Sequence, residues 1–119
     1  MSIQRIESTE RLSGAVVHAG LVYLSGQVPN DRTLDCAGQT HEVLAKIDRL
    51  LEQAGSSRAQ ILAAQIWLKD IQCDFAAMNQ VWVNWLPAGT APARATIEAN
   101  LASSDVRVEI MLVAAKAPT

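Results

Sequence analysis

Residues 106–114 form the stretch that most constrains the fold of this chain, because apolar residues recur at every second position along it. Side chains of a β-strand point alternately to its two faces. One face is then entirely apolar: Val106, Val108, Ile110 and Leu112. The other face mixes charge with large apolar groups: Arg107, Glu109, Met111 and Val113. A plain solvent face rarely carries such a mixture, so we expect both faces to be covered, the first by the core and the second by another subunit.

A second strand is predicted immediately before this one, over residues 93–99. Alternation places Arg94, Thr96 and Glu98 on one of its faces and only apolar residues on the other. An arginine and a glutamate held at a covered boundary can carry chemistry. Arg94 and Glu109 are therefore the first candidates for a functional site.

The N-terminal third of the chain is predicted to be β-structure. Residues 3–7 can form a short edge strand. Two apolar runs, 15–18 and 21–25, are separated by an Ala-Gly pair, which indicates a hairpin with a tight turn. Residues 26–35 are rich in Gly, Pro, Asn and Asp and are predicted to be a loop.

Two helices are predicted in the middle of the chain. Thr40 is expected to cap the first, and Gly55 follows its end. Its apolar positions have helical spacing: Val43, Leu44, Ile47, Leu50, Leu51 and Ala54. After a strand at 61–68, Asp74 is expected to cap the second helix and Pro87 to stop it. The buried stripe of the second helix is expected to comprise Phe75, Met78, Trp82, Trp85 and Leu86.

The order of elements is β-β-α-β-α-β-β, with long connections around each helix. This order favours an α+β sandwich, in which one sheet carries both helices on the same face. At 119 residues the chain is long enough for one core, and we expect a single domain over residues 1–119.

Composition narrows the function. A net charge of −2 and a pI near 5.6 give no electrostatic reason to bind nucleic acid. No apolar run reaches the roughly 20 residues that span a bilayer, and the N-terminus does not resemble a signal peptide. Cys36 and Cys73 are expected to be free thiols, and their spacing from the two histidines fits no zinc pattern. We therefore expect a cytoplasmic protein without a metal.

Four segments of the chain, taken in order, resemble the RidA/YjgF family of reactive enamine and imine deaminases. They read L-V-Y-L-S-G-Q-V-P, L-L-E-Q-A-G-S-S, I-W-L-K-D-I-Q-C-D-F-A-A-M-N, and A-P-A-R-A-T-I-E followed by V-R-V-E-I. The resemblance covers nearly the whole chain. It implies a chorismate-mutase-like fold with one mixed sheet. It also implies a homotrimer closed around a central β-barrel, with pockets between the subunits.

Arg94 and Glu109 each have a structural alternative to a role in a site. A guanidinium suits a substrate carboxylate, but Arg94 can equally form a salt bridge. Glu109 can act as a general base on water, but it can equally pair with Arg107 or Arg94. The resemblance favours function in both cases, since Arg94 matches the family's carboxylate-binding arginine and Glu109 its water-positioning glutamate.

Five further residues are expected at the substrate by resemblance. Ser25 and Gly26 would form a pocket wall, and Asn79 would donate or accept a hydrogen bond near the pocket, with a plain helix-surface role as the alternative. Two positions depart from the family pattern. Leu12 stands about where the best-known branch has a pocket tyrosine, and Thr96 replaces a frequent cysteine. The chain thus looks like a divergent branch of the family with a shorter N-terminus.

The function implied is hydrolysis of 2-imino and 2-enamino acids, such as 2-iminopropanoate and 2-iminobutanoate, to 2-keto acids and ammonia without a cofactor. A different class of function remains open, a non-catalytic module that senses a small carboxylate in the same pocket. A third activity attached to some members, ribonuclease or inhibition of translation, is disfavoured by the acidic pI and by the lack of a histidine pair.

Overall fold

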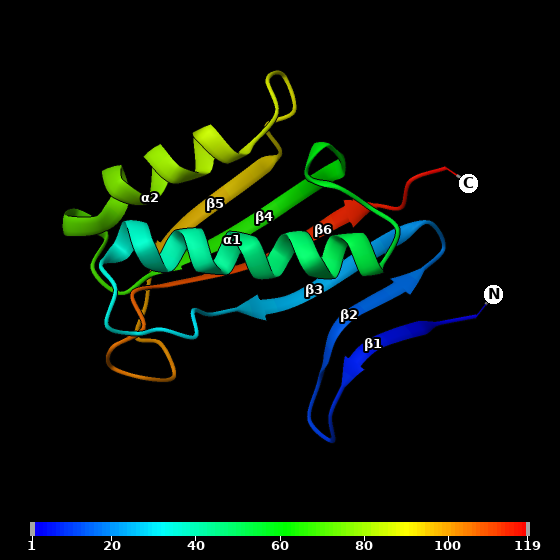
Figure 1. The fold of residues 1–119 in the computed structure, drawn as a ribbon, viewed down its shortest axis with the longest axis horizontal. Helices are drawn as coiled ribbons and strands as arrows, with labels where there is room; N and C mark the ends of the chain where they lie inside the picture. The colour runs from blue at the N-terminus through cyan, green and yellow to red at the C-terminus, as the bar shows by residue number, and fades with distance from the viewer. Residues whose placement is uncertain (1, 119) are drawn as a thin grey trace.

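The structure, a computed structural model, describes residues 2–118 as one six-stranded mixed sheet with two α-helices (Figure 1). The elements are β1 Gln4–Ser8, β2 Ser13–His18, β3 Leu21–Gln27, α1 Cys36–Gln53, β4 Ile61–Leu68, α2 Ile71–Trp85, β5 Ala93–Glu98 and β6 Val108–Ala115. A short 3₁₀ helix, Arg58–Gln60, precedes β4. The strand order is β1-β2-β3-β6-β4-β5, and only β4 and β5 are parallel. The predicted α+β class is confirmed.

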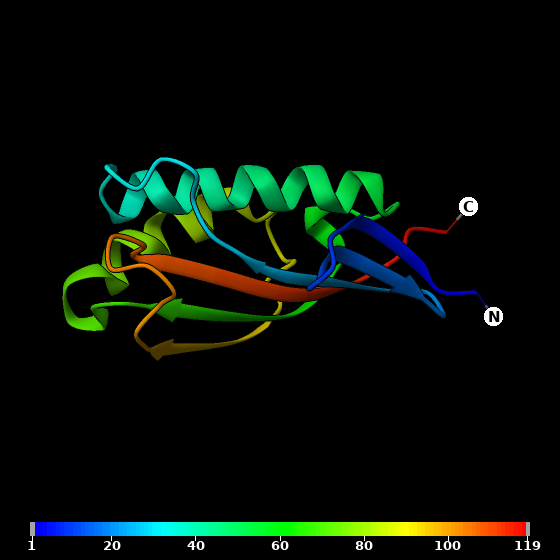
Figure 2. The same cartoon turned by 90° about the horizontal axis from the view of Figure 1, so that it is seen from below.

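Both helices cover the same face of the sheet, as the side view in Figure 2 shows. The core lies between the helices and this face. Its largest fully buried apolar side chains are Val22, Leu24, Leu44, Ile47, Leu50, Leu51, Ile66, Leu68, Met78, Ile110 and Leu112. On the opposite face no element of residues 2–118 covers the sheet. Met111 is 41% exposed there, and Tyr23, the cross-strand partner of Val113, is also exposed.

The N-terminal strands follow the predicted pattern. β2 and β3 form a hairpin, and the two residues between them, Ala19 and Gly20, both have positive φ angles of 52° and 80°. Such angles at both central positions are typical of the tight turn that matches strand twist. β1 pairs with β2 and confirms the predicted edge strand.

The predicted start of the first helix is wrong. Asp35, not Thr40, caps α1, and its carboxylate accepts a hydrogen bond from the backbone N–H of Gly38 at 2.9 Å. Thr40 lies one turn inside the helix, fully buried, and its hydroxyl donates to the carbonyl of Cys36 at 2.7 Å. The predicted helix end holds, since Gly55 has a φ of 80° just beyond the last turn.

The predicted start of the second helix is also wrong. Asp70 caps α2 by accepting from the N–H of Cys73 at 3.1 Å. Asp74 lies within the first turn, only 5% exposed, and accepts two hydrogen bonds of 3.0 Å from the guanidinium of Arg107. Arg107 precedes β6 and reaches this helix, so it does not share the uncovered face with Glu109.

The predicted buried stripe of α2 is correct only in part. Met78 and Trp82 are buried, whereas Trp85 and Leu86 are partly buried at the edge of the core. Phe75 is 42% exposed, because α2 starts earlier than expected and Asp74 occupies the inner position of its first turn.

We expect Asp74→Asn to lower the free energy of unfolding by about 2 kcal/mol, since it removes a charge-assisted, two-point hydrogen bond from a buried site. Urea denaturation measures this change. The matched control is Asp105→Asn, which touches an exposed ion pair with Arg32 at 3.8 Å and should change stability by less than about 1 kcal/mol. Equal losses of unfolding free energy in the two variants would contradict the conclusion that the buried Asp74–Arg107 pair stabilises the fold more than the exposed Asp105–Arg32 pair does.

Candidate functional site

The seven predicted site residues form two groups that lie on opposite faces of the sheet. Glu109 alternates with the buried residues of β6 and therefore points away from the helices. Arg94 pairs in register with the buried Ala64 of β4, and its side chain contacts α2. Within one chain the sheet itself separates the guanidinium from the carboxylate.

The first group is built on an irregularity in the pairing of β3 with β6. The register shifts between Leu24 and Gln27, so that Ser25 and Gly26 lie in a β-bulge. The carboxylate of Glu109 occupies the place where a Cβ on residue 26 would lie. A side chain at residue 26 would therefore displace the Glu109 carboxylate from its present position, a reason for glycine that the sequence pattern did not supply.

Ser25 and Leu12 lie at the same end of the sheet as this bulge. The Ser25 hydroxyl donates to the carbonyl of Gly14 at 3.3 Å and accepts from the Gln27 side-chain amide at 3.1 Å. Leu12 ends the turn that leads into β2, the strand paired with β3, and is 53% exposed. Gln27, buried and bonded to Ser25, is a neighbour that sequence reasoning missed.

Glu109 has no ion-pair partner within residues 2–118, so within one chain it pairs with neither Arg107 nor Arg94, the two structural alternatives considered for it. Arg107 is bonded to Asp74, and Arg94 lies on the other face. Partial burial without a compensating cation raises the pKa of Glu109 above its ordinary value. A partly buried carboxylate without a cation partner is a candidate general base.

The second group surrounds Arg94. Its Nη1 donates to the side-chain oxygen of Asn79 at 2.6 Å, so Asn79 lies beside Arg94. The guanidinium carbon lies 5.9 Å from the ring centre of Trp82 and 6.0 Å from that of Phe75. Burial lowers the pKa of Arg94, and the residue makes no salt bridge within the described chain.

A pocket of about 440 Å³ opens beside Arg94. Besides Arg94 and Asn79, it is lined by Trp82, Val83, Leu86, Pro87, Ala88, Gly89, Ala91 and Pro92. Two strand positions beyond Arg94, on the same face, the hydroxyl of Thr96 is buried and has no hydrogen-bond partner within residues 2–118. Buried polar atoms are rarely left unbonded, but this hydroxyl is closed off from solvent and Thr96 does not line the pocket.

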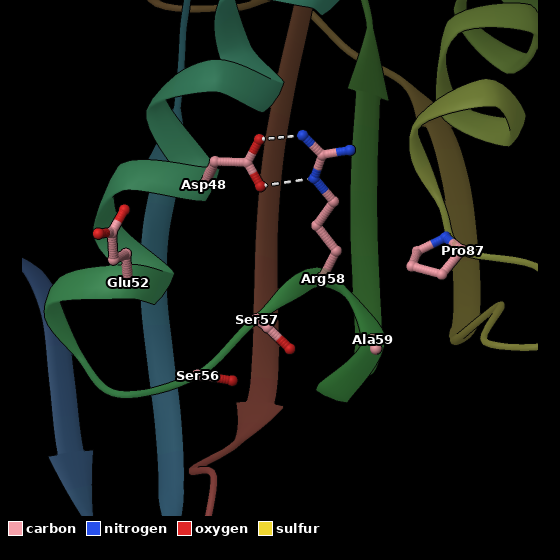
Figure 3. A pocket seen from close by; sticks show the side chains of 7 residues that line it. All are labelled: Asp48, Glu52, Ser56, Ser57, Arg58, Ala59 and Pro87. Atoms are coloured by element: carbon pink, nitrogen blue, oxygen red, sulfur yellow. Dashed lines mark hydrogen bonds and ion pairs between the residues drawn. The ribbon is translucent and has the colours of Figure 1, made fainter.

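A second depression of similar size, about 450 Å³, lies between α1 and the 3₁₀ helix (Figure 3). Its centre is a two-point ion pair in which Arg58 donates to Asp48 at 2.8 and 2.7 Å. Asp48 also accepts from the indole N–H of Trp85, and Arg58 donates to the Trp85 carbonyl, each at 3.1 Å. These charges satisfy one another, so the cluster fastens α2 to α1 and lacks the unpaired charge found beside Arg94.

Other kinds of site receive no support from the part of the chain described. Residues 2–118 contain no group of three or more His, Cys, Asp or Glu side chains that could hold a metal ion. Neither helix in this range is both long and apolar enough to cross a membrane.

Comparison with known proteins identifies the family of this chain. Residues 2–116 match the family described as Endoribonuclease L-PSP. A RutC family protein from Haemophilus influenzae is 45% identical over 116 residues, covering 96% of this chain and 98% of that protein. This chain belongs to the RidA/YjgF family. The Escherichia coli RutC family protein YoaB is 44% identical over 97% of this chain and 99% of its own length.

Structural comparison agrees. A YjgF family member from Neisseria meningitidis has 46% identical residues and a TM-score of 0.96, covering 100% of this chain and 98% of that one. The predicted YjgF-like, chorismate-mutase-like fold is thereby confirmed. The placement in a divergent branch stays a prediction, as do the roles of the individual site residues.

The raised pKa of Glu109 leads to a stability prediction. The folded state holds the proton of Glu109 more tightly than the unfolded state does, so ionised Glu109 destabilises the fold at neutral pH. Glu109→Gln should therefore raise the free energy of unfolding at pH 7. The gain should shrink as the pH falls through the raised pKa and vanish below the ordinary value of 4.5.

Urea unfolding between pH 4 and pH 8 tests this prediction at a protein concentration at which light scattering shows single chains, because a neighbouring chain would bring its own charges to Glu109. Glu52→Gln, a change on the surface of α1, is the control and should show no such pH-dependent gain. A wild-type protein more stable than Glu109→Gln at pH 7 would contradict the assignment of an uncompensated carboxylate.

Proposed function

We propose that this protein hydrolyses 2-imino and 2-enamino acids to 2-keto acids and ammonia, in a pocket formed between subunits of a homotrimer. One observation carries the proposal. Arg94 and Glu109, at the positions matched to the family's site, are both partly buried, and neither is paired with an opposite charge within residues 2–118. Unpaired, half-buried charges lower stability and are concentrated at functional sites.

The chemistry follows from these two groups. The guanidinium of Arg94, held on one side by Asn79, binds the substrate carboxylate through its remaining N–H groups. Glu109 accepts a proton from water, whose oxygen then attacks the C=N carbon. The proton is returned to nitrogen, the C–N bond breaks, and protonated imine plus water yields keto acid plus ammonium. Imines hydrolyse unaided, so positioning and charge complementarity can supply most of the acceleration.

The positions of the two groups support a site shared by two subunits. A short acid bound to Arg94 cannot reach Glu109 of the same chain, because the sheet lies between them. The uncovered face carries exposed apolar side chains next to Glu109, including Met111. Packing this face against other copies removes apolar surface from water, and only Glu109 of another chain could then act on a substrate bound to Arg94.

The remaining residues have supporting roles in this proposal. Ser25 and Gly26 form the wall behind Glu109, and Leu12 extends this wall at the end of β2. On the Arg94 side, Thr96 lies two strand positions from Arg94 on the same face, where it supports the pocket without lining it.

A second candidate is a non-catalytic module that binds a small carboxylate. Arg94 and its pocket suit this function equally well, and Leu12 offers no hydroxyl to a reacting substrate. Glu109 argues against it, because a second unpaired anion adds nothing to carboxylate binding. Nuclease activity has less support, since the chain carries a net charge of −2, which does not attract a phosphate backbone.

The activity is tested by generating 2-imino acids with an amino-acid oxidase while semicarbazide captures the imine that has not yet been hydrolysed. Wild type should divert the imine to keto acid. Arg94→Ala and Glu109→Gln should each lower kcat/KM by about a hundredfold or more, through lost carboxylate binding and lost base catalysis respectively. Arg5→Ala and Glu52→Gln, at exposed positions, are the controls. Carboxylate binding that depends on Arg94 without hydrolysis of any imine would favour the sensor.

Mixing inactive variants tests whether the site is shared. When Arg94→Ala and Glu109→Gln chains are mixed one to one and reassembled from the unfolded state, about three quarters of random trimers contain both. Every mixed trimer has one junction at which an intact Arg94 meets an intact Glu109. About a quarter of the wild-type activity should therefore return. No recovery, in mixtures that light scattering shows to be trimeric, would contradict a site between subunits.

A further inference from the structure

The pocket beside Arg94 is larger and more apolar than the side chain of a short substrate needs. Of the side chains that line it, only Arg94 and Asn79 are polar. We infer that this pocket receives the side chain of the substrate and that the enzyme prefers 2-imino acids with bulky apolar side chains, branched or aromatic, over the shortest ones. This inference rests on the proposed function and adds a substrate class to it.

The position of the pocket relative to Arg94 supports the inference. A carboxylate bound by the guanidinium lies at one end of the pocket, whose walls continue along the C-terminal turns of α2 and the loop 86–92. A volume of about 440 Å³ is within the range of small-molecule sites. A methyl group would leave most of this volume to water, whereas an isobutyl or benzyl group would displace that water from apolar walls.

The two polar side chains of the pocket are already engaged with each other. The Asn79 oxygen accepts from Arg94, and Arg94 itself is reserved for the carboxylate. No carboxylate lines the pocket, so the cationic side chain of an imine derived from arginine or lysine would be left without a partner there. The site therefore selects for apolar side chains and against basic ones.

The apolar wall is held in place from behind. Trp82 is only 4% exposed, and its ring centre lies 5.8 Å from that of Trp85. Trp85 is fixed in turn by its hydrogen bond to Asp48 and by the Arg58 ion pair seen in Figure 3. A wall anchored in this way is already ordered before the substrate binds, and such preorganisation favours selectivity.

The test compares imines generated from alanine, leucine, phenylalanine and arginine in the oxidase assay. For wild type, kcat/KM for the leucine and phenylalanine imines should exceed that for the alanine imine by about tenfold or more, and the arginine imine should be poor. Val83→Trp narrows the pocket from a position that is 66% exposed. It should lower the rates for bulky imines about tenfold and change the alanine imine less than about twofold.

Asn84→Trp is the matched control, because Asn84 follows Val83 on α2, is exposed and does not line the pocket. It should change no rate appreciably. The inference is overturned if wild type hydrolyses the alanine imine as well as the bulky ones. It is also overturned if Val83→Trp slows all imines equally or disrupts assembly in light scattering, because the pocket would then hold a neighbouring subunit.

Failure of the proposed function gives a different result. If no imine is hydrolysed, calorimetric binding of two keto acids, 4-methyl-2-oxopentanoate and pyruvate, still tests the pocket. The larger acid should bind about tenfold more tightly, Val83→Trp should remove that difference, and Arg94→Ala should weaken both. Equal affinities for the two keto acids would by themselves overturn the inference that the pocket prefers large apolar side chains.

Discussion

The two faces of β6 determine how the rest of the molecule is arranged. This strand lies between β3 and β4, and its apolar side faces both helices. Alternation then forces Glu109 onto the side that no element of the described chain covers. The bulge in β3 makes room for its carboxylate over Gly26. One strand thus creates the core and, on its back, an uncovered surface with an uncompensated charge.

The same sheet also positions Arg94, but on the opposite face, which the helices cover. β5 lies at the sheet edge, parallel to β4, and its register with Ala64 turns Arg94 towards α2. If the two charged groups lay on one face they could neutralise each other, and neither would then be available to a substrate. The sheet keeps them apart within a chain. Partial burial disfavours the charged form of both groups, which lowers the pKa of Arg94 and raises the pKa of Glu109.

The sequence predicted the features that depend on local pattern and missed those that depend on long-range packing. Alternation predicted both faces of β6 except at Arg107, which precedes the strand and bonds to Asp74, and turn chemistry predicted the hairpin after β2. The helix caps were misplaced because Asp35 and Thr40, or Asp70 and Asp74, are equally good capping types a few residues apart. Asp74 is instead the partner of Arg107, 33 residues away, which no periodicity can show. The relative faces of Arg94 and Glu109 depend on strand register, which becomes known only when β4 is placed between β5 and β6.

This dependence on register gives the arrangement its specificity. A slip of one residue between β4 and β5 would move Arg94 to the face of Glu109 and expose its partners Asn79 and Trp82. The bidentate clamp of Asp48 and Arg58 on Trp85, and the Asp74–Arg107 pair, fasten α2 near its two ends. With α2 fixed, a one-residue slip of β5 would separate Arg94 from Trp82. Interactions that take no part in the chemistry thus decide which side of the sheet presents the cation and which presents the base.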